Sequence, residues 1–251
     1  MEALKTGTTT FGDFYYPMTE LVKNHVALGT RAVVSSMINQ LPADTSGIDV
    51  TVPYPLDPAI GERKLRDNIE LVERYHDSEN GRIQCRFGPH APDMCTDEML
   101  REIRALGDKY GVNFFTHLSQ SPKENNQVLM RSGMRPTEFL EKLGYLNERT
   151  LVAHMTYATD QEVRRVAESG AAFAFCCNSL CIIDGELPKG QEFAAYGGRV
   201  GFGTDQAPGN NCNIMFNEMK MASLLHKFKN ADPTVMPAWK TLRMATIEAA
   251  S

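Results

Sequence analysis

The chain has 251 residues, of which 42% are hydrophobic and 23% are charged, values typical of a globular protein with a sizeable core. This length fits one α/β barrel domain of roughly 250 residues or two smaller domains. The net charge is −5 without a block of like charges, so there is no basic face for nucleic acid or acidic lipid. No apolar stretch reaches the roughly 18 residues of a membrane span, and no signal peptide pattern opens the chain. We therefore expect a small-molecule ligand, and a homo-oligomer is compatible with the sequence.

The six cysteines include a close group at Cys176, Cys177 and Cys181. No C-x-x-C pair is matched by a second one, which argues against a structural zinc, and the chain is too long to be a disulfide scaffold. The sequence predicts buried, reduced thiols and a cytoplasmic location, with a soft-metal site at the close group as the alternative.

Seven short apolar runs alternate with segments of helical periodicity. The predicted strands are Thr8–Phe14, Thr30–Met37, Ile83–Gly88, Asn113–His117, Leu151–His154, Ala171–Cys177 and Val200–Gly203. The predicted helices are Thr19–Leu28, Gly61–Ser78, Thr96–Tyr110, Lys123–Leu143, Thr159–Glu168, Asn213–Lys229 and Met236–Ala249, with Thr96 and Thr159 as hydroxyl caps. EALKTG, near the first residue, reads as the tail of a helix with its glycine cap.

Helices between all the strands imply a parallel sheet, and seven strands are one short of a closed eight-stranded barrel. The rival is an open doubly wound sheet, which would normally carry a glycine-rich phosphate loop after its first strand. GTTTFGDF is not such a loop. The proline-rich stretch 39–60 is predicted to be a long loop after the second strand, or else a domain linker.

Acid–base residues stand at the ends of four of these runs: His90 in FGPHAP, His117 in FFTHLSQ, His154 in LVAHMTY and Asp205 in VGFGTDQ. Because parallel strands in a barrel deliver their carboxyl ends to one face, we expect these groups to form a site. Imidazole and carboxylate are ligands for zinc or ferrous iron, and such an ion lowers the pKa of its bound water to about 7. The remaining histidines fall within amphipathic helices, and structural or surface roles are expected for them: His25, His76 and His226.

The segments GTTTFGDFYY, FGPHAPDMC, HLSQSPKE, LVAHMTY and GFGTDQAPGNNCNIMFNEMKMASLLHK resemble the amidohydrolase superfamily. The most similar branch is that of methylthioadenosine/S-adenosylhomocysteine deaminase and the triazine hydrolases. The resemblance implies a metal-dependent (β/α)8 TIM-type barrel with a small β-sandwich built from both chain ends. It treats 1–251 as a single barrel domain, one that lacks strand one and the sandwich and looks cut at both ends.

The resemblance also implies roles for residues. His117 and Asp205 would be metal ligands, and Asp205 the general base. His154 would hold the hydrolytic water or ligate metal, and His90 would contact substrate, as would Glu20 in the loop after the first predicted strand. RIQCRFGPH has no lysine of the kind that bridges two metals, which favours one ion, zinc first and ferrous iron second.

Three departures from the family pattern stand out. The paired H-x-H histidines have no counterpart, and Gln120 occupies the place of the proton-shuttling glutamate, where it would contact substrate but an amide moves no proton. Glu124, one helical turn on, is a weak substitute. Cys177-Asn178-Ser179-Leu180 replaces the usual Pro-x-Ser-Asn. An H-x-H upstream of Met1 would complete the metal site, and with two of four ligands this chain alone is expected to be inactive.

The leading hypothesis is therefore a metal-dependent hydrolase of non-peptide C–N bonds, which deaminates or dealkylates an amino-substituted nitrogen heterocycle. The alternative, based on Gln120, is a relative that binds a heterocycle without hydrolysing it. A barrel lyase or isomerase acting on phosphorylated substrates ranks last, since the Ala207–Asn210 stretch is a poor phosphate cradle.

Overall fold

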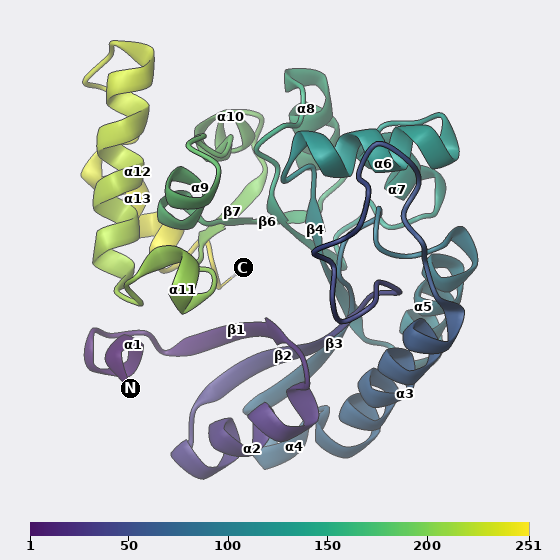
Figure 1. Cartoon of the computed structure of the whole chain (residues 1–251). Coiled ribbons are helices and arrows are strands. Elements are labelled where there is room, and N and C mark those ends of the chain that lie inside the picture. The colour runs from purple at the N-terminus through teal and green to yellow at the C-terminus, as the bar shows by residue number, and fades with distance from the viewer. Residues whose placement is uncertain (251) are drawn as a thin grey trace. The chain divides into compact units, whose positions relative to one another are not determined.

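The computed structural model describes residues 1–250, which divide into two compact units (Figure 1). The N-terminal unit comprises residues 9–118 and 122–150, and the C-terminal unit comprises residues 1–8, 119–121 and 151–250. Each unit has its own parallel strands and its own helices.

The N-terminal unit is built on four strands that pair in parallel and in chain order. They are β1 (Thr10–Tyr15), β2 (Arg31–Ile38), β3 (Ile83–Pro89) and β4 (Asn113–Leu118). The helices of this unit are α2 (Met18–Leu28), α3 (Pro58–Tyr75), α4 (Ser78–Gly81), α5 (Asp97–Tyr110), α6 (Pro122–Ser132) and α7 (Pro136–Lys142). Figure 1 shows α2 and α3 along one side of β1–β3, which is the arrangement that parallel strands joined by helices require.

Side chains of β4 alternate between the two faces of the sheet. Phe114 is fully buried on the face toward α5, where a Cβ on Gly107 would lie only 2.1 Å from its ring. Because strand side chains point to opposite faces in turn, Phe115 and His117 share the other face. The strand thus aims His117 away from the helix layer.

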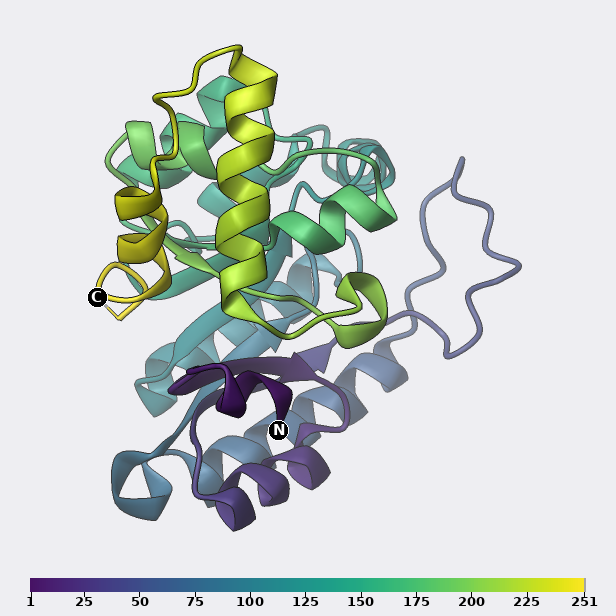
Figure 2. The same cartoon turned by 90° about the vertical axis from the view of Figure 1, so that its left-hand side faces the viewer.

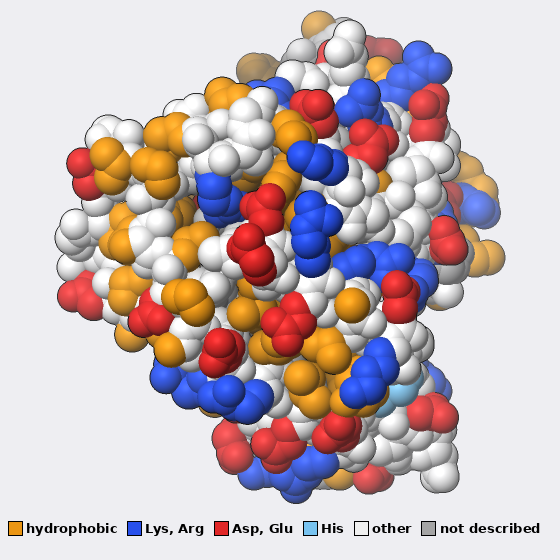
Figure 3. All heavy atoms as spheres, turned by 90° about the vertical axis from the view of Figure 1, so that its right-hand side faces the viewer, with side chains coloured by type: hydrophobic (Ala, Val, Ile, Leu, Met, Phe, Trp, Pro, Cys, Tyr) orange, Lys and Arg blue, Asp and Glu red, His pale blue; other side chains and the backbone are white. Residues whose placement is uncertain are grey.

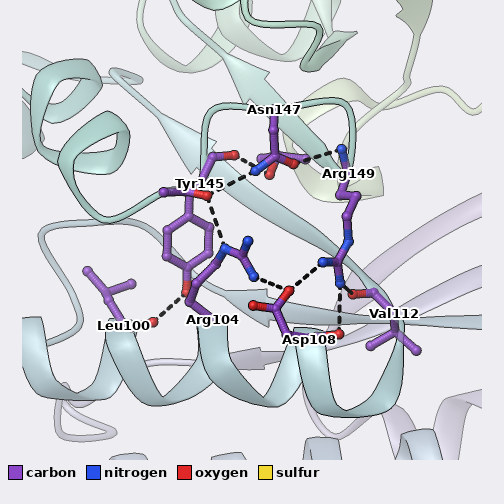
Figure 4. A network of polar contacts seen from close by, with 10 residues as sticks. Leu100, Arg104, Asp108, Val112, Tyr145, Asn147 and Arg149 are labelled. Carbon is purple, nitrogen blue, oxygen red and sulfur yellow. Dashed lines mark hydrogen bonds and ion pairs between the residues drawn. The ribbon is translucent and has the colours of Figure 1, made fainter.

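A charged network fixes the end of α5 to the segment that precedes the fifth strand (Figure 4). Asp108 accepts hydrogen bonds from Arg104 and Arg149, which hold the pKa of its carboxyl below the ordinary value. Arg149 also donates to the carbonyl of Gly107, in the last turn of α5, and to that of Val112, just beyond the helix, both at 2.7 Å.

The long loop 39–57 has no helix or strand, as the prolines predicted, and Figure 2 shows it projecting from the ribbon. One buried side chain of α6 holds it. Gln127 donates to the carbonyls of Val50 and Val52 at 2.9 and 2.8 Å and accepts from the amide of Tyr54 at 2.9 Å. The amide uses both its donors and its acceptor on the loop backbone.

The C-terminal unit carries three parallel strands, β5 (Thr150–His154), β6 (Ala172–Phe175) and β7 (Arg199–Phe202). Its helices are α1 (Glu2–Lys5), α8 (Asp160–Glu168), α9 (Cys177–Ile183), α10 (Gly190–Ala195), α11 (Ala207–Asn210), α12 (Met215–Asn230) and α13 (Ala238–Ala245). Helix α8 begins with the predicted cap, a full capping box between Thr159 and Glu162. Figure 2 shows α13 alongside α12.

The α/β class with seven parallel strands is confirmed, and each predicted strand lies within two residues of an observed one. Three details were wrong. The predicted helix 123–143 is two helices, because Gly133 adopts a left-handed φ of 71° and Pro136 starts a new helix. The predicted last helix ends at Ala245, and the predicted sixth strand ends at Phe175, where α9 follows within two residues.

The surface and the cysteines agree with the composition. Lys and Arg side chains are interspersed with Asp and Glu on the face that Figure 3 shows. All six cysteines are free, and the two buried ones beside α9, Cys176 and Cys177, have pKa values raised well above the ordinary thiol value. Across residues 1–250, no helix has both the length and the apolar character needed to cross a bilayer.

Candidate functional site

The predicted site residues are divided between the two units. His90 and His117 belong to the N-terminal unit, whereas Gln120, His154 and Asp205 belong to the C-terminal unit. His117 lies near the end of β4, His154 ends β5, and Asp205 follows β7 by three residues. The strand-end placement predicted for these residues is therefore confirmed.

In the N-terminal unit, His90 and His117 lie together, with ring centroids 4.9 Å apart. The backbone amide of His117 donates to the carbonyl of His90 at 3.0 Å, and its ring Nδ1 lies 2.8 Å from the same oxygen. A carbonyl can only accept, so Nδ1 carries the proton and Nε2 is the unprotonated nitrogen of the neutral ring. Metal-binding histidines commonly have this arrangement, in which the second ring nitrogen donates to a carbonyl.

An aromatic side chain of β1 packs against both imidazoles. The Phe14 ring lies 5.2 Å from His117, 6.3 Å from His90 and 4.6 Å from Phe115. This approach depends on Gly88, where a Cβ would lie 2.5 Å from the Phe14 ring. The glycine therefore lets the ring reach the pair.

His90 stays neutral at ordinary pH. Burial is the largest cause that lowers its pKa to about 3, followed by electrostatic interactions with His117 and Lys64. The turn after it is held by Arg131 of α6, which donates to the carbonyls of Pro92 and Asp93 at 2.6 and 3.1 Å. The side chain of Asn39 lies 3.1 Å from Nδ1 of His90.

In the C-terminal unit, residues at or just after the ends of strands have backbone angles rare for residues other than glycine. The φ angles are 49° at Ser119, 78° at His154 and 60° at Asp205. Such residues cost about 1–3 kcal/mol each and cluster at functional sites. His154 is also buried, with 2% of its surface exposed.

A buried carboxylate secures the loops around Asp205. Glu218 of α12 accepts from the amides of Cys177 and Asn178, both at 3.1 Å, and from Nδ2 of Asn210 at 2.6 Å. Asn210 also donates to the carbonyl of Thr204, the residue before Asp205. Glu218 thus connects the turn after β6 with the loop after β7.

The two other predicted substrate contacts, Glu20 and Gln120, lie in different units. Glu20 was expected in a loop, but it lies in the first turn of α2, where it is exposed and pairs with Lys23 at 2.7 Å. Gln120 lies two residues after β4, in the C-terminal unit. Glu124, the possible substitute for the missing glutamate, is buried in α6 of the N-terminal unit.

Sequence reasoning missed Phe14, Asn39, Lys64 and Glu218 as parts of these arrangements. Asn39 directly follows β2, so its strand-end position was a usable signal. Glu218 lies inside a helix of ordinary periodicity, and nothing local marks it as buried.

A zinc ion needs three or four ligands from the protein, and the predicted site offers histidine and aspartate donors. His117 has the second-nitrogen contact of a ligand, but within residues 1–250 no group of three or more His, Cys, Asp or Glu residues is arranged to hold an ion. Within the described residues, the donor set is therefore incomplete for a bound ion.

The family model described as "Amidohydrolase family" matches residues 1–251. The chain belongs to the amidohydrolase family. This confirms the resemblance seen in the strand-end motifs.

Two similar proteins of this family are deaminases by name. A 5'-deoxyadenosine deaminase of Methanothermobacter thermautotrophicus is 32% identical over 250 residues, covering 100% of this chain and 55% of that protein. A 5-methylthioadenosine/S-adenosylhomocysteine deaminase of Moorella thermoacetica is 34% identical over 251 residues, which are 100% of this chain and 55% of that protein. The chain spans about half the length of the curated relatives that it matches.

Solved structures of the family show the same fold. An adenosine deaminase from Xanthomonas campestris with bound zinc has a TM-score of 0.86 at 26% identity, covering 99% of this chain and 54% of that one. A triazine hydrolase variant has a TM-score of 0.84 at 25% identity, and the match covers 99% of this chain and 56% of that one. The predicted barrel class is thus supported by amidohydrolase structures that match this chain along nearly its whole length.

Proposed function

We propose that this chain supplies part of a metal-dependent hydrolase that acts on a non-peptide C–N bond of an amino-substituted nitrogen heterocycle. The family match over 1–251 carries this proposal, and the names of the two deaminase relatives support the deamination of adenosine-like compounds. The orientation of His117, with Nδ1 donating to a carbonyl, is what a metal ligand needs.

In this proposal, His117, His154 and Asp205 hold one divalent ion, zinc first and ferrous iron second. Such an ion supplies a polarised water when it is bound. Asp205 would act as the general base, and His90, Glu20 and Gln120 would contact the substrate. The residues 1–251 act as one barrel domain of the enzyme. The free cysteines support a cytoplasmic location, since reduced thiols are typical there.

A second candidate is a relative that binds a heterocycle without hydrolysing it. Gln120 supports this alternative, because an amide at the family's proton-shuttle position cannot carry a proton between the water and the leaving nitrogen.

The first test is a zinc titration of the 251-residue chain against a chelator of known affinity, with His117→Gln and Asp205→Asn beside the unchanged protein. We expect weak binding that each variant weakens further, and no turnover, because the paired H-x-H ligands of the family pattern have no counterpart in this sequence. Zinc affinity that both substitutions leave unchanged would exclude the proposed ligands.

The second test uses the product of the whole gene, loaded with zinc and assayed for ammonia release from 5'-deoxyadenosine, 5'-methylthioadenosine, S-adenosylhomocysteine and aminotriazines. Turnover of at least one compound is expected, and it should be lost in the Asp205→Asn variant. A blank panel with the metal bound would favour the heterocycle-binding alternative.

A further inference from the structure

Three side chains of the N-terminal unit form a chain of hydrogen bonds that ends at His90. The ammonium of Lys64 in α3 donates to Oδ1 of Asn39 at 2.8 Å, and Nδ2 of Asn39 lies 3.1 Å from Nδ1 of His90. Lys64 is half-buried and its ammonium lies 5.3 Å from the ring centroid of Tyr16. Tyr16 in turn donates to Asp67 at 2.7 Å, so the far end of the chain is also anchored.

The orientation of the Asn39 amide follows from what its neighbours can do. Lys64 and the backbone amide of Leu41, at 3.3 Å, can only donate, and both face one atom of Asn39. That atom must be the oxygen, so the amide nitrogen faces His90. If the amide were flipped, its NH2 group would face two other donors, Lys64 and the amide of Leu41.

The tautomer of His90 is then determined as well. An amide NH2 only donates, so Nδ1 of His90 must be the acceptor and the proton of the neutral ring lies on Nε2. His117 has the opposite tautomer, since its Nδ1 donates to the carbonyl of His90. Two adjacent imidazoles thus differ in hydrogen-bond polarity, one with Nε2 as donor and the other with Nε2 unprotonated.

We propose that Lys64 and Asn39 are positioning residues that fix His90 as a hydrogen-bond donor through Nε2–H. The ligand that His90 contacts must then present a lone pair to it, either a ring nitrogen or an oxygen. A ligand with an N–H group at that point would meet donor against donor, and a site that leaves polar groups unpaired discriminates strongly. That the ligand is a nitrogen heterocycle rests on the proposed function, whereas the tautomer of His90 does not.

The tautomers are read directly from two-bond proton–nitrogen correlation spectra of the metal-free 251-residue chain with ring-¹⁵N histidine. His90→Gln and His117→Gln variants assign the two rings. We expect the Nε2–H pattern for His90 and the Nδ1–H pattern for His117. The opposite pattern at His90 would overturn the inference. This measurement requires neither enzyme activity nor a substitution of Asn39 or Lys64.

Asn39→Asp is the decisive variant. A carboxylate only accepts, so His90 should switch to the Nδ1–H tautomer while His117 keeps its pattern. In Lys64→Met only the longer contact with the amide of Leu41 still holds the Asn39 oxygen, so His90 should show a minor population of the Nδ1–H tautomer. Asn147→Asp makes the same chemical change elsewhere in the unit, on an asparagine that bonds to Gly144 and Arg149, and should leave both rings unchanged. A His90 spectrum that is unaltered in Asn39→Asp would overturn the inference.

The ligand half is tested with the zinc-loaded product of the whole gene and three deaza analogues of 5'-deoxyadenosine, in which C–H replaces N1, N3 or N7. At least one replacement should weaken binding about tenfold or more, and Asn39→Asp should abolish that difference. Equal binding of all analogues by a protein that binds the parent compound would overturn the acceptor requirement. Failure to bind the parent compound, with the His90 tautomer as expected, would count against the proposed function instead.

Discussion

In the N-terminal unit, His117 takes its orientation from a backbone carbonyl and His90 from a side-chain amide. In the C-terminal unit, the loop that carries Asp205 is held by the buried carboxylate of Glu218. The backbones differ too, since His154 and Asp205 have positive φ angles and neither His90 nor His117 does.

The difference shows two ways of holding a polar group at a strand end. In the N-terminal unit, the groups that contact the two rings are neutral, although the Lys64 ammonium orients one of them. A buried carboxylate can satisfy several backbone amides at once, but it must lose its hydration to do so. We therefore expect the C-terminal unit to depend on charge and pH, and the N-terminal unit on packing.

The largest effect is expected from Glu218→Ala. Three buried donors lose their acceptor, at roughly 1–3 kcal/mol for each group, so unfolding free energy should fall by about 3–5 kcal/mol. Urea denaturation measures the loss.

Two further variants sharpen the interpretation of Glu218. Glu218→Gln should cost less than Glu218→Ala, because its oxygen can still accept from two backbone amides. Glu168→Ala, at an exposed ion pair with Arg164, should change stability by less than about 1 kcal/mol. A Glu218→Ala protein as stable as Glu168→Ala would show that the network does not hold the loops.

A second expected effect is an acid sensitivity at His226 of α12. His226 is fully buried and, among residues 1–250, neither ring nitrogen has a hydrogen-bond partner; burial, the largest cause, lowers its pKa to about 4. The folded state therefore resists protonation below the ordinary pKa of 6.5. Its stabilising effect is complete above pH 6.5 and is lost as the pH falls toward 4, by up to about 3 kcal/mol.

His226→Leu removes this dependence. The difference in unfolding free energy between His226→Leu and the unchanged protein should shift in favour of the variant between pH 6.5 and 4. The raised pKa of Glu218 acts in both proteins and cancels from that difference. A difference that stays constant over this pH range would contradict the prediction.

The smallest of the three effects concerns packing in the N-terminal unit. Gly88→Ala places a methyl group 2.5 Å from the Phe14 ring and 2.3 Å from the hydroxyl of Ser35, which should cost about 1–3 kcal/mol. Gly12→Ala in β1 is the matched control, because a Cβ there meets nothing within 4 Å. Equal stability of the two variants would show that the close approach of Phe14 to β3 is not needed.

The same pair of variants tests the site. Displacement of Phe14 should shift the ring resonances of His117, which lies 5.2 Å from it, and Gly12→Ala should leave them in place.

The sequence by itself determined the strands and the chemistry at their ends. Strands buried on both faces are continuous apolar runs, so their positions follow from local composition, and residues such as His117 and His154 stand out at their ends. Helix starts were equally local: Thr96 and Thr159 accept from amides three residues ahead. The short helices α9, α10 and α11 escaped notice, because fewer than two turns show no clear period.

Only the tertiary structure decided which atoms meet those strand ends. Asn39 and His90 are 51 residues apart, and Glu218 is 41 residues from Cys177, so no local pattern links them. The tautomers of the two histidines depend on these partners, since a ring nitrogen that faces an acceptor carries the proton and one that faces a donor does not. A sequence can thus place an imidazole at a strand end, whereas its role as donor or acceptor is determined by neighbours that folding brings to it.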